Sequence, residues 1–116
     1  MHPLLDLSKV RVLPLESRKS LTRVEDILVD PASPPKPCSE SVARAVDRCA
    51  TEILQAQSKG AKVMLIYGAH LLRNGAAKIL DRMMEKGWIG HLATNGAGTI
   101  HDWEYSFLGQ IGRAHV

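Results

Sequence analysis

Two stretches of the chain repeat apolar residues at helical spacing, and a short apolar run lies between them. In the first stretch, residues 39–58, the apolar positions fall on one stripe, which predicts an amphipathic helix with one buried face. Ser39 can cap the start of this helix, and Gly60 lies just past its end, where a left-handed residue is favoured. The stripe consists of Val42, Val46, Cys49, Ile53 and Leu54. We therefore expect all five side chains, the Cys49 thiol included, to lie in the core.

The apolar run and the second stripe together predict a strand–helix–strand unit. Val63–Ile66 is apolar throughout, as in a parallel strand that is buried on both faces. A helix is expected over residues 71–86, and a second strand over residues 88–94. Gly75 lowers the stability of this helix by about 1 kcal/mol relative to Ala. Two explanations for a glycine here stay open: the helix approaches the sheet or a ligand closely at this point, or the position tolerates any small residue. The stripe of this helix consists of Leu72, Ala76, Ile79, Leu80 and Met83. Two parallel strands joined in this way place the turns that follow them at one edge of the sheet.

Residues 1–37 are expected to form an irregular amino-terminal arm that ends in a proline-rich linker. Lys9–Leu13 alternates polar and apolar residues, which indicates one short strand. Residues 21–29 have a weak helical pattern. Four prolines lie between Pro31 and Pro37, and because proline fixes φ and lacks an N–H, this segment is extended. Both a plain connector and a polyproline-type ligand fit it. Residues 38–110 then hold the first βα units of an α/β domain.

Composition and charge narrow the class of protein. At 116 residues the chain has room for one domain. Its net charge of +3 is scattered, and basic and acidic residues alternate along residues 71–86, so we expect no nucleic-acid partner. The sequence has no secretory apolar region and no apolar run near the ~20 residues of a membrane span. Cys38 and Cys49 are too few for a disulfide framework. We expect a cytoplasmic chain with free thiols and no membrane contact.

The turn after the second strand, TNGAG at residues 94–98, has the parts of an anion-binding loop. Glycine lets backbone N–H groups approach a phosphate, and the helix that follows adds partial positive charge at its start. Thr99 to Asp102 fits a capping box that opens this helix. Because neither GxGxxG nor GxxxxGK[ST] occurs here, two interpretations stay open: a phosphate or dinucleotide site, and an ordinary βα turn.

Histidines near the strand ends raise a metal site as an alternative. His70 follows the first strand and His101 lies beyond the second, so both could meet Asp102 at the sheet edge, whereas His91 lies within a strand. No HxH or HExxH pair supports a metal site. Asp102 also serves simply as a cap, and His101 is either a polar site residue or a residue with no special role.

The same residues carry a resemblance to a known family. The segments YGAHLLRNG (67–75) and TNGAGTIHD (94–102) follow the two strands and are separated by a helix of matching length. They resemble the TSNLISSG and TAGGVEED motifs of the deoxyhypusine synthase family. Gly75 matches the glycine of the first motif, Thr94 the threonine of the second and Asp102 its final acid. The segment LPLESRKSLTRVED (13–26) is similar to the prokaryotic branch of this family.

The resemblance implies a Rossmann-like parallel sheet with flanking helices that binds NAD, in a homotetramer with sites between subunits. Enzymes of the family oxidise the polyamine spermidine with NAD. They then transfer its aminobutyl group, through an imine on an enzyme lysine, to a lysine of a translation factor. When the family's first motif is aligned with this chain, His70 lies at the position of a cofactor-binding Asn. Asn74 lies at the position of a Ser. The residues implied to lie against the cofactor are His70, Asn74, Thr94, Asn95, Gly96, His101 and Asp102.

Two features of the chain depart from the family. The paired glutamates of the second motif become Ile100 and His101, which removes two carboxylates from the implied site. The catalytic lysine of the family belongs to its carboxyl half, so we expect an amino-terminal fragment that is inactive alone. A Rossmann-like nucleotide-binding module without transfer activity and a homospermidine synthase-like enzyme that acts on small amines stay open. Residues 111–116, IGRAHV, are one translation of a nucleotide string that resembles a common sequencing-library adapter, so we expect a non-native tail there.

Overall fold

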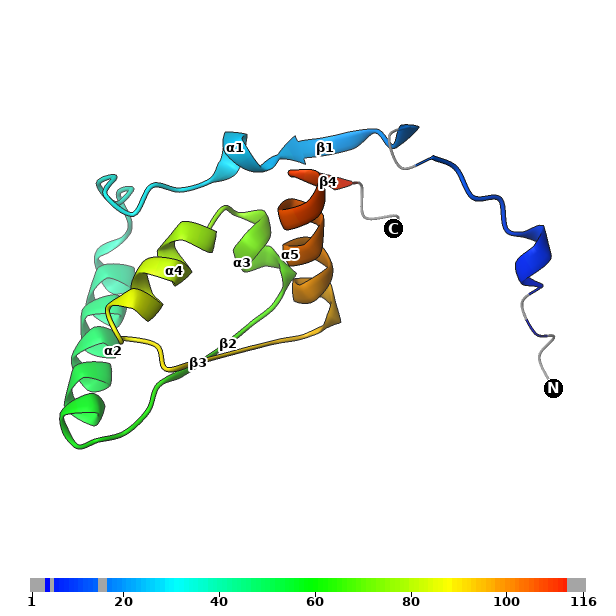
Figure 1. The fold of residues 1–116 in the computed structure, drawn as a ribbon. Helices are drawn as coiled ribbons and strands as arrows, with labels where there is room; N and C mark the ends of the chain where they lie inside the picture. The colour runs from blue at the N-terminus through cyan, green and yellow to red at the C-terminus, as the bar shows by residue number, and fades with distance from the viewer. Residues whose placement is uncertain (1–3, 5, 15–16, 113–116) are drawn as a thin grey trace.

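The structure is a computed structural model that describes residue 4 and residues 6–14 and 17–112 (Figure 1). Its elements follow in the order η1 (Leu7–Lys9, a 3-10 turn), β1 (Ser20–Arg23), α1 (Val24–Ile27), α2 (Glu40–Ser58), β2 (Met64–Tyr67), α3 (Ala69–Arg73), α4 (Ala77–Glu85), β3 (His91–Thr94), α5 (Gly96–Leu108) and β4 (Gln110–Gly112). Helices and two small sheets alternate along the chain, so the general α/β character predicted from the sequence is confirmed.

The centre of the fold is the parallel pair of β2 and β3. Met64 pairs with His91, and Tyr67 pairs with Thr94, so both strands end at the same edge. This arrangement confirms the strand–helix–strand unit. In the described part of the chain this sheet has two strands, which is fewer than a Rossmann-like sheet requires, and the larger sheet stays a prediction.

One face of this pair packs on α3 and α4 to make the core. Leu72 of α3, Leu80 of α4 and Ile89 before β3 are all at least nine-tenths buried and form one cluster. Leu65 of β2 and Leu92 of β3 pack against them from the sheet. The predicted stripe of residues 71–86 is therefore buried where it meets the strands that precede and follow it in sequence.

The predicted helix over residues 71–86 is two helices, α3 and α4, with a break at Gly75. Gly75 has a φ of +82°, a left-handed value that ends α3. A Cβ at this position would overlap the carbonyl of Ile27 in α1, and the Gly75 carbonyl accepts a hydrogen bond of 3.0 Å from the Val29 N–H. Gly75 is therefore not a tolerant position. It makes a close approach, but to the backbone of the amino-terminal segment and not to the sheet.

The amino-terminal segment forms more structure than the sequence predicts. The strand expected over Lys9–Leu13 is wrong, because Asp6 caps the η1 turn and the residues that follow are irregular. Of residues 21–29, the first three belong to β1, the next four form α1, and the last two are irregular. β1 pairs antiparallel with β4, Thr22 opposite Ile111, and Ile111 is only 4% exposed. Of the expected non-native tail, residues 113–116 lie outside the described residues.

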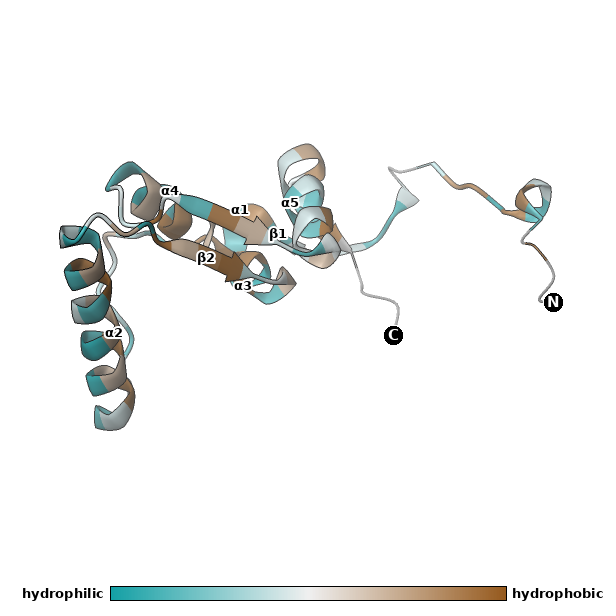
Figure 2. Cartoon of the chain, turned by 90° about the horizontal axis from the view of Figure 1, so that it is seen from below, coloured by the Kyte–Doolittle hydropathy of each residue, from teal (hydrophilic) through white to brown (hydrophobic). Residues whose placement is uncertain are grey.

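α2 forms as predicted but does not pack as predicted. The Ser39 side chain accepts a hydrogen bond from the Val42 N–H, and Gly60 adopts a φ of +82° just past the helix end, so both termini are confirmed. The stripe is not buried: Val42, Val46 and Leu54 are half exposed or more, and Cys49 is exposed. The expectation of a core Cys49 is wrong because α2 lies beside the β2–β3 pair and not over it (Figure 2).

Candidate functional site

The turns after β2 and β3 lie side by side at the carboxyl edge of the sheet. The Thr94 hydroxyl donates a hydrogen bond of 2.8 Å to the Tyr67 carbonyl and so ties the end of β3 to the end of β2. A Cβ on Gly68, the residue after β2, would lie 3.7 Å from Nδ2 of Asn95, the residue after β3. The sequence correctly predicts that these two turns meet.

The second turn presents unpaired backbone N–H groups at the start of α5. Asn95 is the N-cap: its side chain accepts a hydrogen bond of 3.1 Å from the Gly98 N–H, and its carbonyl accepts from Gly98 and Thr99. The N–H groups of Gly96 and Ala97 have no partner among the described residues. Because α5 is 13 residues long, its aligned dipoles favour an anion at this end.

Gly98 fixes how closely α5 follows the strand. It is buried, and a Cβ at this position would overlap the Thr94 hydroxyl. Any larger residue would therefore displace the Thr94 side chain and its bond to Tyr67. Gly98 is therefore needed for packing between strand and helix whether or not a ligand binds, whereas a Cβ on Gly96 would meet nothing within 4 Å.

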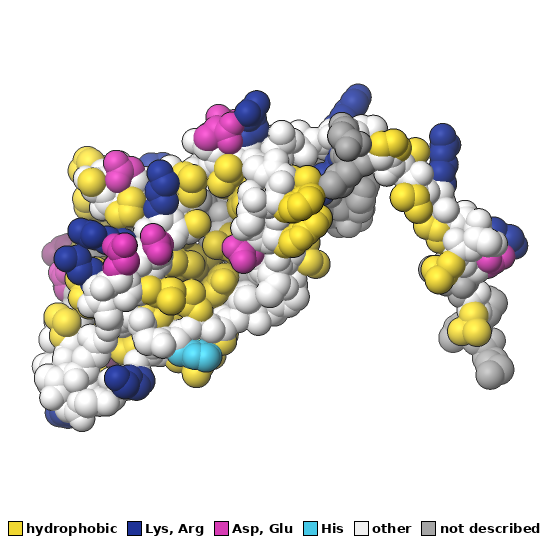
Figure 3. Space-filling view, in the orientation of Figure 1, with side chains coloured by type: hydrophobic (Ala, Val, Ile, Leu, Met, Phe, Trp, Pro, Cys, Tyr) yellow, Lys and Arg dark blue, Asp and Glu magenta, His cyan; other side chains and the backbone are white. Residues whose placement is uncertain are grey.

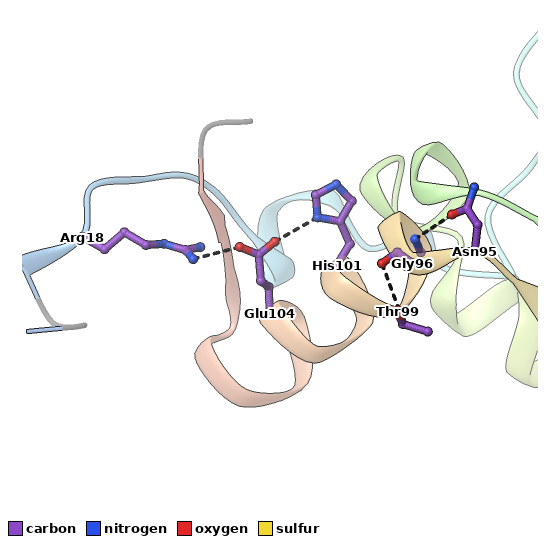
Figure 4. A network of polar contacts seen from close by, with 7 residues as sticks. Arg18, Asn95, Gly96, Thr99, His101 and Glu104 are labelled. Carbon is purple, nitrogen blue, oxygen red and sulfur yellow. Dashed lines mark hydrogen bonds and ion pairs between the residues drawn. The ribbon is translucent and has the colours of Figure 1, made fainter. Parts of the chain in front are cut away.

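The predicted capping box at Thr99–Asp102 is wrong. α5 begins at Gly96, four residues earlier than the box requires, because Asn95 and not Thr99 caps the helix. The Thr99 hydroxyl donates back to the Gly96 carbonyl at 2.9 Å, as threonine does inside a helix (Figure 4). Asp102 consequently lies in the second turn of α5 and caps nothing.

His101 belongs to a chain of polar contacts that runs away from the turn (Figure 4). Its Nδ1 lies 2.9 Å from Oε2 of Glu104, and Oε1 of Glu104 accepts a hydrogen bond of 2.8 Å from the Arg18 guanidinium. The Glu104 side chain is 12% exposed. Burial raises the pKa of Glu104. The hydrogen bonds from His101 and Arg18 lower it by more than burial raises it, so the pKa lies below the ordinary 4.5. The Glu104 bond holds the imidazole in one orientation and leaves Nε2 for another partner.

Asp102 lines a cavity on another side of α5. The cavity has a volume of about 330 Å³ and lies between α1, α3, α4 and α5. Its polar lining includes Lys78, Asp81, Asp102 and Tyr105. The Tyr105 hydroxyl is buried without a partner among the described residues, and burial raises its pKa. Asp102 and His101 therefore face different surroundings although they are neighbours in sequence.

The structure divides the seven predicted site residues among several places. Thr94, Asn95 and Gly96 form the turn itself. His70 lies exposed in the first turn of α3, beyond Gly68. Asn74 lies at the opposite end of α3, where it ends the helix, and is exposed. His101 and Asp102 lie further along α5, in the two separate surroundings described above.

The metal alternative gains no support from the geometry. Among the described residues there is no group of three or more His, Cys, Asp or Glu side chains that could hold a metal ion. His101 is paired with Glu104, and Asp102 faces the cavity beside α1. The side chains proposed to converge on an ion thus point to different places.

Two residues of the polar chain were missed by the sequence analysis. Glu104 could have been found, because it lies three residues after His101, a spacing at which helical side chains are neighbours. Arg18 could not, because 86 residues separate it from Glu104 and no periodic pattern relates the two.

A comparison of the chain with protein-family models, with curated proteins and with solved structures finds no match to any of them. The helices of the described part of the chain are each too short or too polar to cross a lipid bilayer.

Proposed function

We propose that the carboxyl edge of β2 and β3 binds a phosphate group of NAD. The observation that carries this proposal is the pair of unpartnered N–H groups of Gly96 and Ala97 at the start of α5. Two adjacent N–H donors and the positive end of a helix are the usual protein partners of a phosphate. Asn95 occupies the cap without adding negative charge, so the turn stays electrically suited to an anion.

The residues at this edge could hold the cofactor in a simple way. Gly96 and Ala97 would donate to a phosphate oxygen, and the exposed Asn95 amide lies beside them. His70 is close in sequence to Gly68 of the neighbouring turn and is free to turn toward the same ligand. When bound, NAD would supply an acceptor for a hydride; these side chains would orient it.

We further propose that the chain is part of a deoxyhypusine synthase-like enzyme that moves an aminobutyl group from a polyamine to a lysine or amine acceptor. The support is the pair of motif-like segments, which are the two turns that meet at the sheet edge. The homo-oligomer, the spermidine substrate and the translation-factor acceptor rest on the same resemblance. A homospermidine synthase-like activity on small amines is the variant of this proposal with another acceptor.

One observation favours a binding module without transfer activity. Ile100 and His101 stand where the family has paired acids; Ile100 is 58% exposed, and His101 is engaged by Glu104. Neither offers a carboxylate to a cationic amine near the turn. Nucleotide binding and amine transfer are therefore separate proposals with separate tests.

The first test places a negative charge where the phosphate would lie. Asn95→Asp keeps the helix cap, since Asp caps as well as Asn, but repels an anion. We expect its Kd for NAD, measured by calorimetry, to rise about tenfold or more, which corresponds to ~1.4 kcal/mol. Ser39→Asp makes a matched change at the α2 cap and should leave NAD affinity unchanged. Equal NAD affinity of Asn95→Asp and the unaltered chain would contradict the phosphate proposal.

The second test concerns transfer alone. The chain is incubated with NAD and spermidine or shorter amines while NADH absorbance and transferred groups are followed. We expect no turnover by this chain, which lacks an assigned catalytic lysine. We expect spermidine-dependent NADH when a carboxyl-terminal half from a deoxyhypusine synthase-like enzyme is supplied. NAD binding with no turnover in either case would favour the binding module.

A further inference from the structure

The outer face of the β2–β3 pair is apolar and uncovered. Side chains alternate along a strand, so the residues that do not face α3 and α4 share the opposite face. Met64 and Ile66 of β2 lie there and are 56% and 74% exposed. Their partners on β3 are the exposed His91 at the start of the strand and Ala93, so the face is apolar except at His91. Figure 2 looks onto this face, and no other element of the described chain crosses it. Parallel strands are normally covered on both faces.

A second apolar surface of the same chain is also uncovered, and it is the stripe of α2. Val46 is 60% exposed. The opposite face of α2 is charged and internally paired: Arg44 lies 2.7 Å from Glu40, and Arg48 lies 3.9 Å from Glu52. The helix therefore has a solvated side and an apolar side. Among the described residues the apolar side is largely uncovered, and of the stripe residues only Ile53, near the helix end, is partly buried. Figure 3 shows hydrophobic side chains at the surface between α2 on the left and α5 on the right.

The last turn of α2 is bonded to the loop between α4 and β3. Nε2 of Gln57 donates to the carbonyls of Gly87 and Trp88 at 2.9 and 3.2 Å. At the helix end, the N–H groups of Gly60 and Ala61 donate to carbonyls of the last turn. These two bonds cap the helix itself, so it is the pair of Gln57 bonds that α2 would have to break to move over its own sheet.

The accessible surface of the chain is large enough to include a protein–protein interface. Its radius of gyration is 19.0 Å, whereas a compact domain of this length has about 13.4 Å. Its accessible surface is 9853 Å², whereas a folded monomer of 12.7 kDa exposes about 6200 Å². The extended arm contributes to the excess, and so do the two apolar surfaces. A standard interface buries about 1600 Å² in total, which is well within this excess.

We propose that two copies of this chain form a symmetric dimer in which the α2 stripe of each copy covers the outer β2–β3 face of the other. A two-fold axis makes one such contact imply the second, so each copy supplies both surfaces. Each apolar surface then has a partner of its own length and chemistry, while the charged side of α2 stays in water.

The first test traps the contact with the native Cys49 thiol, which lies on the stripe. One tagged version carries Cys38→Ser and keeps Cys49; a second carries Cys38→Ser, Cys49→Ser and Ile66→Cys. Mild oxidation of the mixture should give a disulfide-linked heterodimer on a non-reducing gel. A version with Cys38→Ser, Cys49→Ser and Thr51→Cys, whose single thiol lies on the charged side of α2, is the matched control and should link at least about tenfold less. No heterodimer above that control would overturn the proposal.

A single chain with Cys38→Ser and Ile66→Cys separates the two possible pairings. If α2 covers the partner's sheet, oxidation gives linked dimers. If α2 folds back on its own sheet, oxidation gives monomers whose two thiols are blocked, and the proposal is overturned.

The second test measures assembly directly by sedimentation equilibrium. We expect the unaltered chain to be a dimer, and Val46→Glu and Ile66→Glu each to raise the dimer Kd about tenfold or more, since each buries a charge in an apolar contact. Thr51→Glu should leave the Kd unchanged. Circular dichroism checks that each variant keeps its helices. A monomeric unaltered chain, or a dimer that both variants leave intact, would overturn the proposal.

Discussion

Leu80 of α4 and Val46 of α2 occupy similar places in two similar apolar stripes, yet Leu80 is 6% exposed and Val46 is 60% exposed. Both helices have regular spacing, and both are followed by a glycine with positive φ, Gly87 and Gly60. What differs is the neighbour. In sequence, α4 lies between β2 and β3. These two strands pair with each other, and Leu65 and Leu92 on one face of the pair pack against the core cluster that contains Leu80 of α4.

This comparison separates two kinds of information in an apolar stripe. The stripe predicts that a helix forms, because the helical period places its apolar side chains on one side. It does not say what covers that side. For α4 the partner is adjacent in sequence, and for α2 it is a surface that the structure leaves open.

The largest expected change in the free energy of unfolding comes from substituting one of two glycines that share a φ of +82°, Gly75 and Gly60. Gly75→Ala adds a Cβ that overlaps the Ile27 carbonyl, so strain and a forced shift of the α1 backbone combine. We expect it to lower the free energy of unfolding by about 4 kcal/mol. Gly60→Ala meets nothing within 4 Å and should cost only the backbone strain, about 1 kcal/mol. Urea unfolding measures both. Equal losses would show that Gly75 is not a contact between the amino-terminal segment and the core.

The next largest change in unfolding free energy is expected from shortening one side chain in each of the two apolar stripes. Leu80→Ala removes a side chain from the core cluster and should cost about 3 kcal/mol. Val46→Ala removes a side chain that is mostly in water, and should cost less than about 0.5 kcal/mol at concentrations where the chain is monomeric. Unfolding curves at several protein concentrations distinguish the cases. A large cost of Val46→Ala at the lowest concentration would mean that α2 packs within its own chain.

Local signals in the sequence were enough for much of the fold. Ser39, Gly60 and the period of α2 predicted that helix correctly, and the apolar run at Val63–Ile66 predicted the parallel strand. Errors arose where two local signals competed. Asn95 captured the helix start that Thr99 was expected to cap, and Gly75 divided one expected helix into two.

The rest of the candidate site depends on contacts between distant parts of the chain. The meeting of Gly68 and Asn95 followed from the rule for parallel strands. No such rule relates Arg18 to Glu104, or Gly75 to Ile27, because these contacts depend on how the amino-terminal segment returns to α5 and α3. The apolar period of a helix does not determine which part of the chain packs against it. Nor does it determine which distant residue lies next to a site.

The smallest expected effect concerns this returning segment. Glu104→Gln keeps the shape of the side chain but removes the charge that pairs with Arg18, and should cost about 1 kcal/mol at pH 7. Because the folded-state pKa of Glu104 lies below 4.5, the stability from its charge is present above the unfolded pKa and is lost as the pH falls through the folded pKa. The loss of stability on acidification should therefore be shallower in Glu104→Gln than in the unaltered chain.

The control for this prediction is Glu85→Gln. Glu85 also pairs with an arginine, Arg82 at 3.3 Å, but its side chain is 58% exposed, and exposed ion pairs contribute little. Thermal unfolding between pH 3 and pH 7 should show a shallower acid slope in Glu104→Gln and an unchanged slope in Glu85→Gln. If both variants behave alike, the bond between Arg18 and Glu104 does not hold the amino-terminal segment to α5. The β1–β4 pairing and the hydrogen bond from the Val24 N–H to the Gly109 carbonyl must then do so.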